Sequence, residues 1–349
     1  MSSSDVPPTR PVLEAAMRRA VELARGVVGR TSPNPPVGAV VLDRDGAVVG
    51  EGATAPAGGP HAEIQALRGA GTRAAGGTVL STLEPCAHTG RTGPCTLALR
   101  TAGVACVVFA VADPTALAGG GGRELAAHGV EVEAGLLAAE VARGALRAWL
   151  AAARTGRPHV TWKYAATLDG RVAAADGSSR WITGPQARAD VHRLRDEVDA
   201  VLVGSGTVLT DDPQLTTRGA DGAVAARQPV RVVLDRRRRT PPTARVRDAC
   251  APTILLDSAD PVLALKDLHD RGLRSVLLEG GPTLAGAFVA AGLVDLVVAY
   301  LAPALLGEGP AALGPAGMHS IGDALRLDVE DVVVLGSDLR LTATPRREV

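Results

Sequence analysis

Residues 58–95 read GGPHAEIQALRGAGTRAAGGTVLSTLEPCAHTGRTGPC, and this segment carries the clearest signals of secondary structure in the chain. Its spacing predicts a helix over 61–67, a strand over 78–82 and a short helix after Cys95. The elements expected on either side are a helix over 12–23, strands over 37–42 and 47–50 joined by the turn 43–46, and a strand over 104–111. Helices that alternate with strands predict an α/β layer sandwich.

The length of 349 residues exceeds what a single hydrophobic core usually supports, so two domains are expected. Apolar residues make up 46% of the chain and charged residues 21%, a balance typical of a globular protein rather than a disordered or coiled-coil one. Residues 136–153 predict a closing helix, and the Gly and Pro within 154–158 then break the helical spacing. The expected domains are therefore 1–154 and 155–349.

The second half repeats the alternation of apolar strands with helices. Strands are expected at 159–166, 200–203, 230–234, 253–256, 275–278 and 294–301, and helices at 185–195 and 282–291. This order predicts a second α/β unit.

Acidic and basic residues number 37 each, so the formal net charge is zero. Such a chain has no overall field to attract nucleic acid, which favours a small-molecule partner. No apolar run approaches the roughly 18 residues that span a bilayer, and residues 1–11 lack the apolar stretch of a signal peptide. These features predict a cytoplasmic protein without a membrane partner. The sequence leaves the oligomeric state open, a homo-oligomer included.

The strongest chemical signal is the set His61, Cys86 and Cys95. One imidazole and two thiolates make a three-ligand zinc site whose fourth position is open to water, which is the arrangement of a catalytic site. In a reducing compartment, two nearby cysteines are expected to bind metal rather than form a disulfide. His61 follows Gly-Gly-Pro and Cys95 follows Pro94, so both are expected at helix starts, with the metal at the helix tips.

Glu63 lies two residues after His61, so the two side chains would point to nearly opposite sides of a regular helix. A carboxylate close to the metal, but not bound to it, can carry a proton from water to a leaving ammonia, as in zinc deaminases. The alternative is that His61 is a capping or core histidine and that the cysteines are incidental. Cys106 is expected in the core, and Cys250 belongs to no pattern.

The cysteine spacing, with His88 and Gly90-Arg91-Thr92 between the two cysteines, resembles the deaminase half of the bifunctional riboflavin-biosynthesis deaminase/reductases. Thr31-Ser32-Pro33-Asn34-Pro35 and Thr82-Leu83-Glu84-Pro85 also resemble that family. The resemblance implies a cytidine-deaminase-like three-layer sandwich in which zinc is held by His61, Cys86 and Cys95. It further implies that Glu63 is the catalytic proton shuttle and that Asn34 and His88 lie near the pyrimidine.

Two positions depart from the family's pattern. Gly93 stands where the family usually has proline, and Asp113-Pro114-Thr115-Ala116 stands where it usually reads Asp-Pro-Asn-Pro. The first change predicts a looser loop before Cys95, and the second removes an asparagine. All three expected ligands and Glu63 are retained.

The second half lacks a Gly-x-Gly-x-x-Gly after its first strand, so a standard Rossmann site is not expected. Gly204-Ser205-Gly206 and Glu279-Gly280-Gly281-Pro282 each follow an expected strand, and backbone N–H groups at such turns suit a phosphate. The stretches that resemble the same family's reductase are Lys163–Arg171, Trp181-Ile182-Thr183, Asp211-Asp212-Pro213 and Glu279-Gly280-Gly281. The resemblance thus covers essentially the whole chain and implies a dihydrofolate-reductase-like α/β fold.

The resemblance assigns roles to individual residues of the second half. The NADPH site would be lined by Ala165, Trp181, Thr207, Asp211 and Gly281. The substrate would be contacted by Ser179, Arg195, Leu215, Arg218 and Glu279. Arg195 and Arg218 offer forked donors for a sugar phosphate, and Glu279 can accept hydrogen bonds from ribose hydroxyls or ring N–H groups.

The resemblance implies a bifunctional enzyme of riboflavin biosynthesis with Zn²⁺ and NADPH as cofactors. It would deaminate 2,5-diamino-6-ribosylamino-4(3H)-pyrimidinone 5′-phosphate by zinc-dependent hydrolysis and then reduce the ribosyl side chain to ribityl. One alternative is a nucleobase or tRNA deaminase with an unrelated second domain, which the zero net charge and the lack of a basic, aromatic-interleaved patch disfavour. Another is a non-catalytic regulatory protein, which would be expected to have lost a ligand or Glu63.

Overall fold

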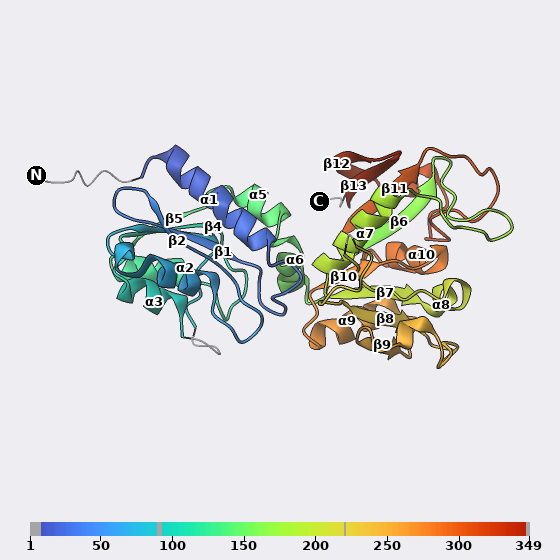
Figure 1. Ribbon diagram of the computed structural model, residues 1–349, viewed down its shortest axis with the longest axis horizontal. Coiled ribbons are helices and arrows are strands. Elements are labelled where there is room, and N and C mark those ends of the chain that lie inside the picture. The colour runs from blue at the N-terminus through green and yellow to red at the C-terminus, as the bar shows by residue number, and fades with distance from the viewer. Residues whose placement is uncertain (1–7, 89–92, 220, 347–349) are drawn as a thin grey trace, which may run out of the picture. The chain divides into compact units, whose positions relative to one another are not determined.

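The chain folds into two compact units, the first ending at Gly156 and the second beginning at Arg157. The computed structural model describes residues 8–88, 93–219 and 221–346. The first unit contains a five-stranded sheet and the second an eight-stranded sheet (Figure 1).

The first unit is a sheet in the order β2-β1-β3-β4-β5 with helices on both sides (Figure 1). β1 is antiparallel to β2 and β3, whereas β3, β4 and β5 are parallel. The elements are α1 (Arg10–Arg25), β1 (Gly38–Leu42), β2 (Val48–Ala53), α2 (Ala62–Ala70), β3 (Thr78–Leu83), α3 (Cys95–Thr101), β4 (Cys106–Val111), α4 (Gly121–Ala127), β5 (Glu131–Ala134), α5 (Ala138–Arg143) and α6 (Arg147–Thr155). This is the expected three-layer sandwich.

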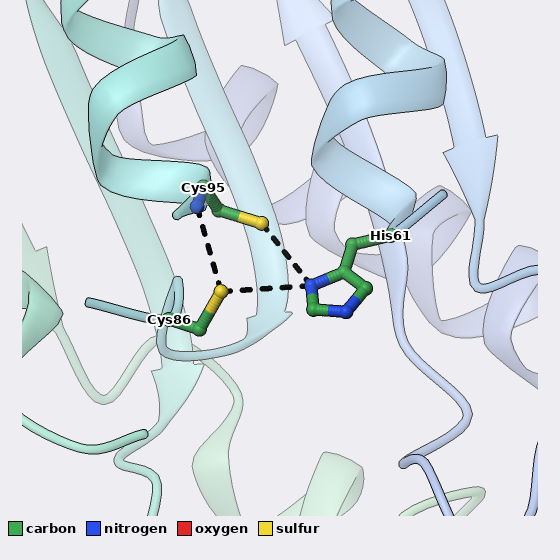
Figure 2. Close-up of side chains that lie close together, drawn as sticks. All are labelled: His61, Cys86 and Cys95. Carbon is green, nitrogen blue, oxygen red and sulfur yellow. Dashed lines mark hydrogen bonds between the residues drawn. The ribbon is translucent and has the colours of Figure 1, made fainter. Parts of the chain in front are cut away.

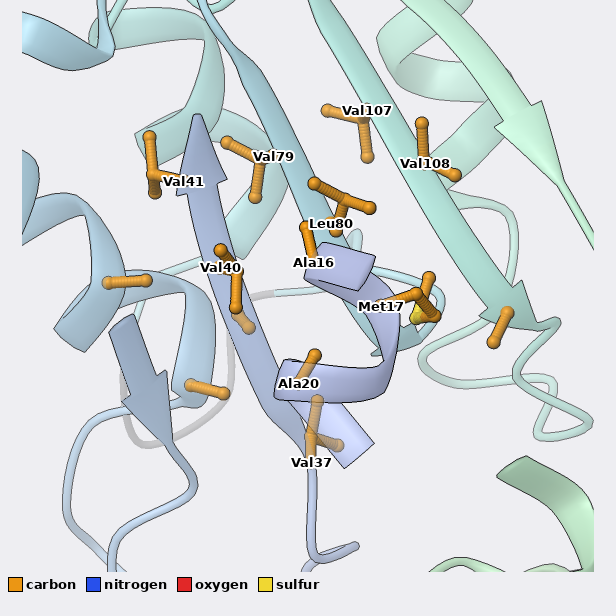
Figure 3. Close-up of a cluster of buried hydrophobic side chains, with 14 of the residues drawn as sticks. Ala16, Met17, Ala20, Val37, Val40, Val41, Val79, Leu80, Val107 and Val108 are labelled. Atoms are coloured by element: carbon orange, nitrogen blue, oxygen red, sulfur yellow. The ribbon is translucent and has the colours of Figure 1, made fainter. Parts of the chain in front are cut away.

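α1 covers one face of this sheet. Its buried residues, among them Met17 and Ala20, recur at helical spacing and lie beside the row formed by Val40 and Leu80 (Figure 3). Gly38 lies on the same face, and a Cβ there would be 1.9 Å from the carbonyl oxygen of Ala20. Glycine at this position therefore permits a close approach of the helix to β1.

α2 packs over β1 and β2 on the other side of the sheet from α1 (Figure 1). A Cβ on Gly52 of β2 would lie 2.3 Å from the carbonyl oxygen of Ala62, the first residue of the helix. The missing side chain lets the start of α2 sit directly on the sheet. That start carries His61 and Glu63.

The single closing helix expected over 136–153 is wrong. The structure has two helices there, α5 and α6, separated at Gly144. Gly144 follows the last residue of α5 with φ −91° and ψ −131°, which lies outside the helical region and is accessible to glycine. Val141 of α5 and Leu150 of α6 are still buried, because each helix turns its own apolar side to the core, and Leu146 between the two helices is buried as well.

The second unit has the strand order β12-β13-β11-β6-β10-β7-β8-β9. The six strands from β11 to β9 are parallel, and β13 and β12 add an antiparallel edge. The elements are β6 (His159–Thr167), α7 (Pro185–Glu197), β7 (Ala200–Gly204), α8 (Ser205–Asp211), β8 (Val230–Leu234), β9 (Thr253–Leu256), α9 (Pro261–Asp270), β10 (Ser275–Leu278), α10 (Pro282–Ala290), β11 (Leu296–Ala302), β12 (Leu327–Leu335) and β13 (Asp338–Pro345).

The central strands of this sheet are buried on both faces. On β7, Ala200 and Leu202 belong to the core cluster that includes residues of α9 and α10. Val201 and Val203 point the other way and belong to a cluster with Leu215. Strands of a parallel sheet that is covered on both sides are typically apolar without interruption. Such apolar runs could therefore be recognised as strands from the sequence.

No strand was expected at β12 and β13. The register of β12 shifts between Val329 and Asp331, so the apolar residues of this strand do not alternate evenly. Among the described residues, no helix is both long and apolar enough to cross a membrane.

Candidate functional sites

The three expected ligands of the first unit meet at one point. His61 precedes α2 as its N-cap, Cys95 is the first residue of α3, and Cys86 follows β3. The His61 Nδ1 atom lies 3.3 Å from the Cys95 Sγ atom and 3.6 Å from the Cys86 Sγ atom (Figure 2). The two helix starts expected from the sequence are therefore both present at the site.

This arrangement fits a zinc ion. The three donor atoms all lie within 4.8 Å of one another. Tetrahedral zinc with Zn–S bonds near 2.3 Å and Zn–N bonds near 2.0 Å separates its ligand atoms by roughly 3.5 Å. The described residues thus provide two sulfurs and one imidazole nitrogen at suitable spacing, and His61 and Cys86 also line a cavity.

The electrostatics of the two thiols also suit a cation. The Cys95 thiol, as a hydrogen-bond donor, lowers the pKa of Cys86 against the opposing effect of burial, and His61 acts in the same direction. The same hydrogen bond raises the pKa of Cys95. The backbone N–H of Cys95 also donates to the Cys86 Sγ atom at 3.4 Å. A thiol whose pKa is lowered is more readily a thiolate, which is the form that binds a metal cation.

Glu63 is buried beside this cluster, with 4% of its surface exposed. Burial raises the pKa of its carboxyl to about 7, and the nearby Cys86 raises it as well. Glu63 lines the same cavity as His61 and Cys86. The carboxyl is therefore placed to exchange a proton with a molecule in that cavity.

The cavity of the first unit has a volume of about 400 Å³. Asn34 and His88, expected near a pyrimidine, both line it. Residues 89–92, which contribute to the family resemblance, lie outside the described residues. Trp149 of α6 also lines the cavity, and the sequence patterns gave no sign of that role.

A second carboxylate, that of Glu84, lines the same cavity. Glu84 accepts hydrogen bonds from the backbone N–H groups of Asp113, at 3.1 Å, and Gly122, at 2.9 Å. The Asp113 Oδ1 atom in turn accepts from the hydroxyl and the backbone N–H of Thr115, at 2.6 and 2.8 Å. The threonine that departs from the family's pattern therefore fixes the Asp113 carboxylate rather than leaving the wall unsupported.

The ten residues expected in the reductase site all line one cavity of about 690 Å³ in the second unit. They are Ala165, Ser179, Trp181, Arg195, Thr207, Asp211, Leu215, Arg218, Glu279 and Gly281. Their sequence positions span more than a hundred residues, so the fold alone brings them together.

Neighbouring parallel strands explain this convergence. β10 lies between β6 and β7, so the turns that follow β7 and β10 are adjacent. The Gly281 N–H lies 3.3 Å from the Thr207 hydroxyl, which joins the two glycine turns recognised in the sequence. Ligands of open α/β sheets bind at the carboxyl ends of such strands.

Arg195 and Glu279 are paired within this cavity. The guanidinium donates from Nε and Nη2 to the two carboxylate oxygens, at 2.6 and 2.9 Å, and from Nη1 to the carbonyl oxygen of Thr216 at 3.0 Å. Burial raises the pKa of Glu279, but the charge of Arg195 outweighs it and lowers the pKa to about 2. All three nitrogens of Arg195 are thus occupied by the protein itself.

The cavity of the second unit is strongly cationic. Its described lining includes six cationic side chains and only two carboxylates, Asp211 and Glu279. The cations that the sequence did not assign to a ligand are Lys163, Arg180, Arg188 and Arg245. Arg188 lies over the Trp181 ring, 4.6 Å from its centroid. A cavity of this charge is suited to ligands that carry phosphates.

Two known domain families match the chain. Residues 11–111 match the cytidine and deoxycytidylate deaminase zinc-binding region, and residues 158–341 match the RibD C-terminal domain.

Similar proteins span the whole chain. The riboflavin biosynthesis protein RibD of Mycobacterium tuberculosis (strain ATCC 25618 / H37Rv) is 52% identical over 334 residues, covering 96% of this chain and 98% of that protein. RibD of Escherichia coli (strain K12) is 40% identical over 361 residues, covering 94% and 98%.

Solved structures of similar proteins also match nearly the whole chain. Acinetobacter baumannii RibD has a TM-score of 0.88 at 39% identity, covering 97% of this chain and 99% of that one. A diaminohydroxyphosphoribosylaminopyrimidine deaminase/5-amino-6-(5-phosphoribosylamino)uracil reductase from Thermotoga maritima has a TM-score of 0.89 at 35% identity, covering 96% and 99%.

A deaminase zinc site in one unit and a reductase domain in the other define a bifunctional deaminase/reductase. The protein uses zinc in the first activity and NADPH in the second. The chain belongs to the RibD family of riboflavin biosynthesis.

Proposed function

We propose that the first unit deaminates 2,5-diamino-6-ribosylamino-4(3H)-pyrimidinone 5′-phosphate and that the second reduces the ribosyl side chain of the product to ribityl with NADPH. The corresponding domains are 1–154 and 155–349. One observation carries the proposal: each unit has its own cavity, one beside a His61–Cys86–Cys95 cluster and the other lined by cationic side chains.

In the first unit, His61, Cys86 and Cys95 would hold zinc, which acts as a Lewis acid and lowers the pKa of water toward neutrality. The deamination adds water to the ring carbon and expels ammonia. Glu63 takes a proton from the attacking water and delivers it to the leaving nitrogen, because its buried carboxyl lines the cavity next to the metal ligands.

In the second unit, Ala165, Trp181, Thr207, Asp211 and Gly281 would line the NADPH site, and NADPH supplies the hydride. Ser179, Arg195, Leu215, Arg218 and Glu279 would face the substrate. The two arginines differ in their contacts with the protein. Arg195 holds Glu279 in place, whereas Arg218 makes no ion pair among the residues that the structure describes and is available for the substrate phosphate.

Product analysis with the aminopyrimidine phosphate tests both halves. Without NADPH, ammonia should be released in proportion to the substrate consumed, and the ribosylaminouracil phosphate should accumulate. Adding NADPH should then oxidise an equal amount of cofactor and yield the ribityl product. Absence of ammonia would contradict the deaminase assignment, and absence of NADPH oxidation after deamination would contradict the reductase assignment. Preferential deamination of cytidine or tRNA would favour the alternative.

A further inference from the structure

Arg218 is held toward the reductase cavity by a neutral side chain. Its Nη2 atom donates to the amide oxygen of Gln214 at 2.6 Å, and its Nη1 atom donates to the carbonyl oxygen of Gly222 at 2.8 Å. Arg195, in contrast, is bound to the carboxylate of Glu279. Arg218 therefore keeps its net positive charge, whereas that of Arg195 is offset.

The Gln214 amide has its own anchor. Its Nε2 atom donates to the Asp248 Oδ2 atom at 2.6 Å. A carboxylate can only accept, so the NH₂ group of the amide must face Asp248 and the oxygen must face Arg218. The orientation of the amide, and with it the acceptor offered to Arg218, follows from the neighbouring carboxylate.

Asp248 is fixed in turn by Arg231 of β8. The Arg231 side chain is fully buried and donates from Nη1 to the Asp248 Oδ1 atom at 2.8 Å. Its Nη2 atom donates to the backbone carbonyl oxygens of Asp248 and Ala251, at 2.5 and 2.6 Å. The hydrogen bond from Arg231 lowers the pKa of Asp248, so this carboxyl stays ionised. A buried guanidinium is thus connected to the cavity through two side chains.

We propose that Gln214 is a positioning residue of the reductase: it holds the Arg218 guanidinium in the orientation that receives the substrate phosphate, and Arg231 and Asp248 hold Gln214. The inference rests on the proposed function, in which Arg218 contacts the phosphate. An acceptor without charge suits this role, because a carboxylate at position 214 would compete with the phosphate for Arg218 and would face Asp248 with like charge.

The test compares Gln214→Met with Gln228→Met. Gln228 is a matched control because it bonds to the backbone of Thr217 in the same segment, at 2.7 and 2.9 Å, but not to Arg218. Reductase kcat/KM is measured for the preformed deaminated substrate with and without its phosphate. Gln214→Met should reduce the preference for the phosphorylated form about tenfold, the loss expected for one charge-assisted hydrogen bond. The KM for NADPH and the zinc content should not change.

Gln228→Met should leave the phosphate preference intact. An equal loss in both variants would overturn the inference, because general loosening of the segment would then explain it. Arg218→Ala should abolish the preference, and adding Gln214→Met to that variant should cost nothing further. If Gln214→Met does not fold, Gln214→Asn keeps the amide but shortens its reach, and it should show the same loss.

The outcomes separate two kinds of failure. A wild-type enzyme without phosphate preference, or an Arg218→Ala variant that keeps it, would contradict the proposed role of Arg218. If Arg218→Ala loses the preference while both Gln214 variants keep it, the positioning role alone is wrong.

Discussion

Arg195 and Glu279 form a bidentate ion pair in the reductase cavity, with donor–acceptor distances of 2.6 and 2.9 Å. Their side chains are 15% and 9% exposed, so both charges are largely removed from water. The arginine that the sequence marks for a phosphate thus also serves to hold a carboxylate in an ionised state.

Arg195→Met should lower the free energy of unfolding of the second unit by about 3 kcal/mol, because it leaves Glu279 buried without its bidentate partner. Lys163, whose Nζ atom lies 4.0 Å from the carboxylate, would then be the nearest ion-pair partner of Glu279 among the described residues. The double variant Arg195→Met/Glu279→Gln should recover much of the loss. The loss in the single variant and its recovery in the double variant are both measured by denaturant unfolding, with hydrogen exchange as the probe of the second unit. An Arg195→Met variant as stable as the wild type would contradict this account.

The same pair predicts a dependence of stability on pH. The pKa of Glu279 is lowered from 4.5 to about 2, so between these values the unfolded chain binds the proton more readily than the folded one. The stabilisation is present above pH 4.5 and is lost as the pH falls toward 2. The difference in unfolding free energy between wild type and Glu279→Gln should therefore shrink by ~3 kcal/mol from pH 5 to pH 2. If the difference in unfolding free energy does not change with pH, the Arg195–Glu279 pair does not cause a pH dependence of stability.

Arg218→Ala should raise the reductase KM for the phosphorylated substrate by roughly 10- to 100-fold, as expected for the loss of a charge-assisted contact. The KM for NADPH, the zinc content and the rate of deamination should stay close to wild type. Steady-state kinetics with preformed deaminated substrate measures the effect. An equal loss with the dephosphorylated substrate would mean that Arg218 does not contact the phosphate.

Cys86→Ser should abolish zinc binding and deamination together, because it removes one of three ligands from a site with no spare donor among the residues grouped there. Reduction of preformed deaminated substrate should continue, since the reductase cavity lies within the other unit. Metal analysis and separate assays of the two reactions test this. A variant that retains stoichiometric zinc would contradict the assigned ligand set.

Glu63→Gln should retain zinc but slow deamination by roughly 10²- to 10⁴-fold, because the amide preserves the shape of the side chain but cannot carry the proton. Metal content and ammonia release are measured on the same preparation. Near wild-type deamination would exclude Glu63 as the proton shuttle. Loss of zinc would instead indicate that its carboxylate supports the ligands.

Several elements were predictable because their signals are local. Turn residues, helix starts after proline and continuous apolar runs predicted the helix that begins after His61, the start of α3 at Cys95 and the central strands of both sheets. The prediction of a single helix over 136–153 is wrong for an equally local reason. Gly144 divides this segment into two helices, and the prediction followed the apolar spacing without taking the glycine into account. The β12–β13 hairpin was missed because a bulge interrupts its alternation.

The sequence was enough to identify the chemical groups: a histidine and a cysteine at expected helix starts, a second cysteine after an expected strand, a glutamate two residues after the histidine, and glycine turns after two expected strands. The partners of these groups, in contrast, depend on the tertiary structure. Arg195 meets Glu279 across 84 positions of sequence, and Thr115 rather than an asparagine fixes Asp113. Likewise, a buried Arg231 determines, through Asp248, which way the Gln214 amide faces. Spacing rules describe neighbours along a helix or strand, whereas these contacts depend on strand order and on which turns the sheet places side by side.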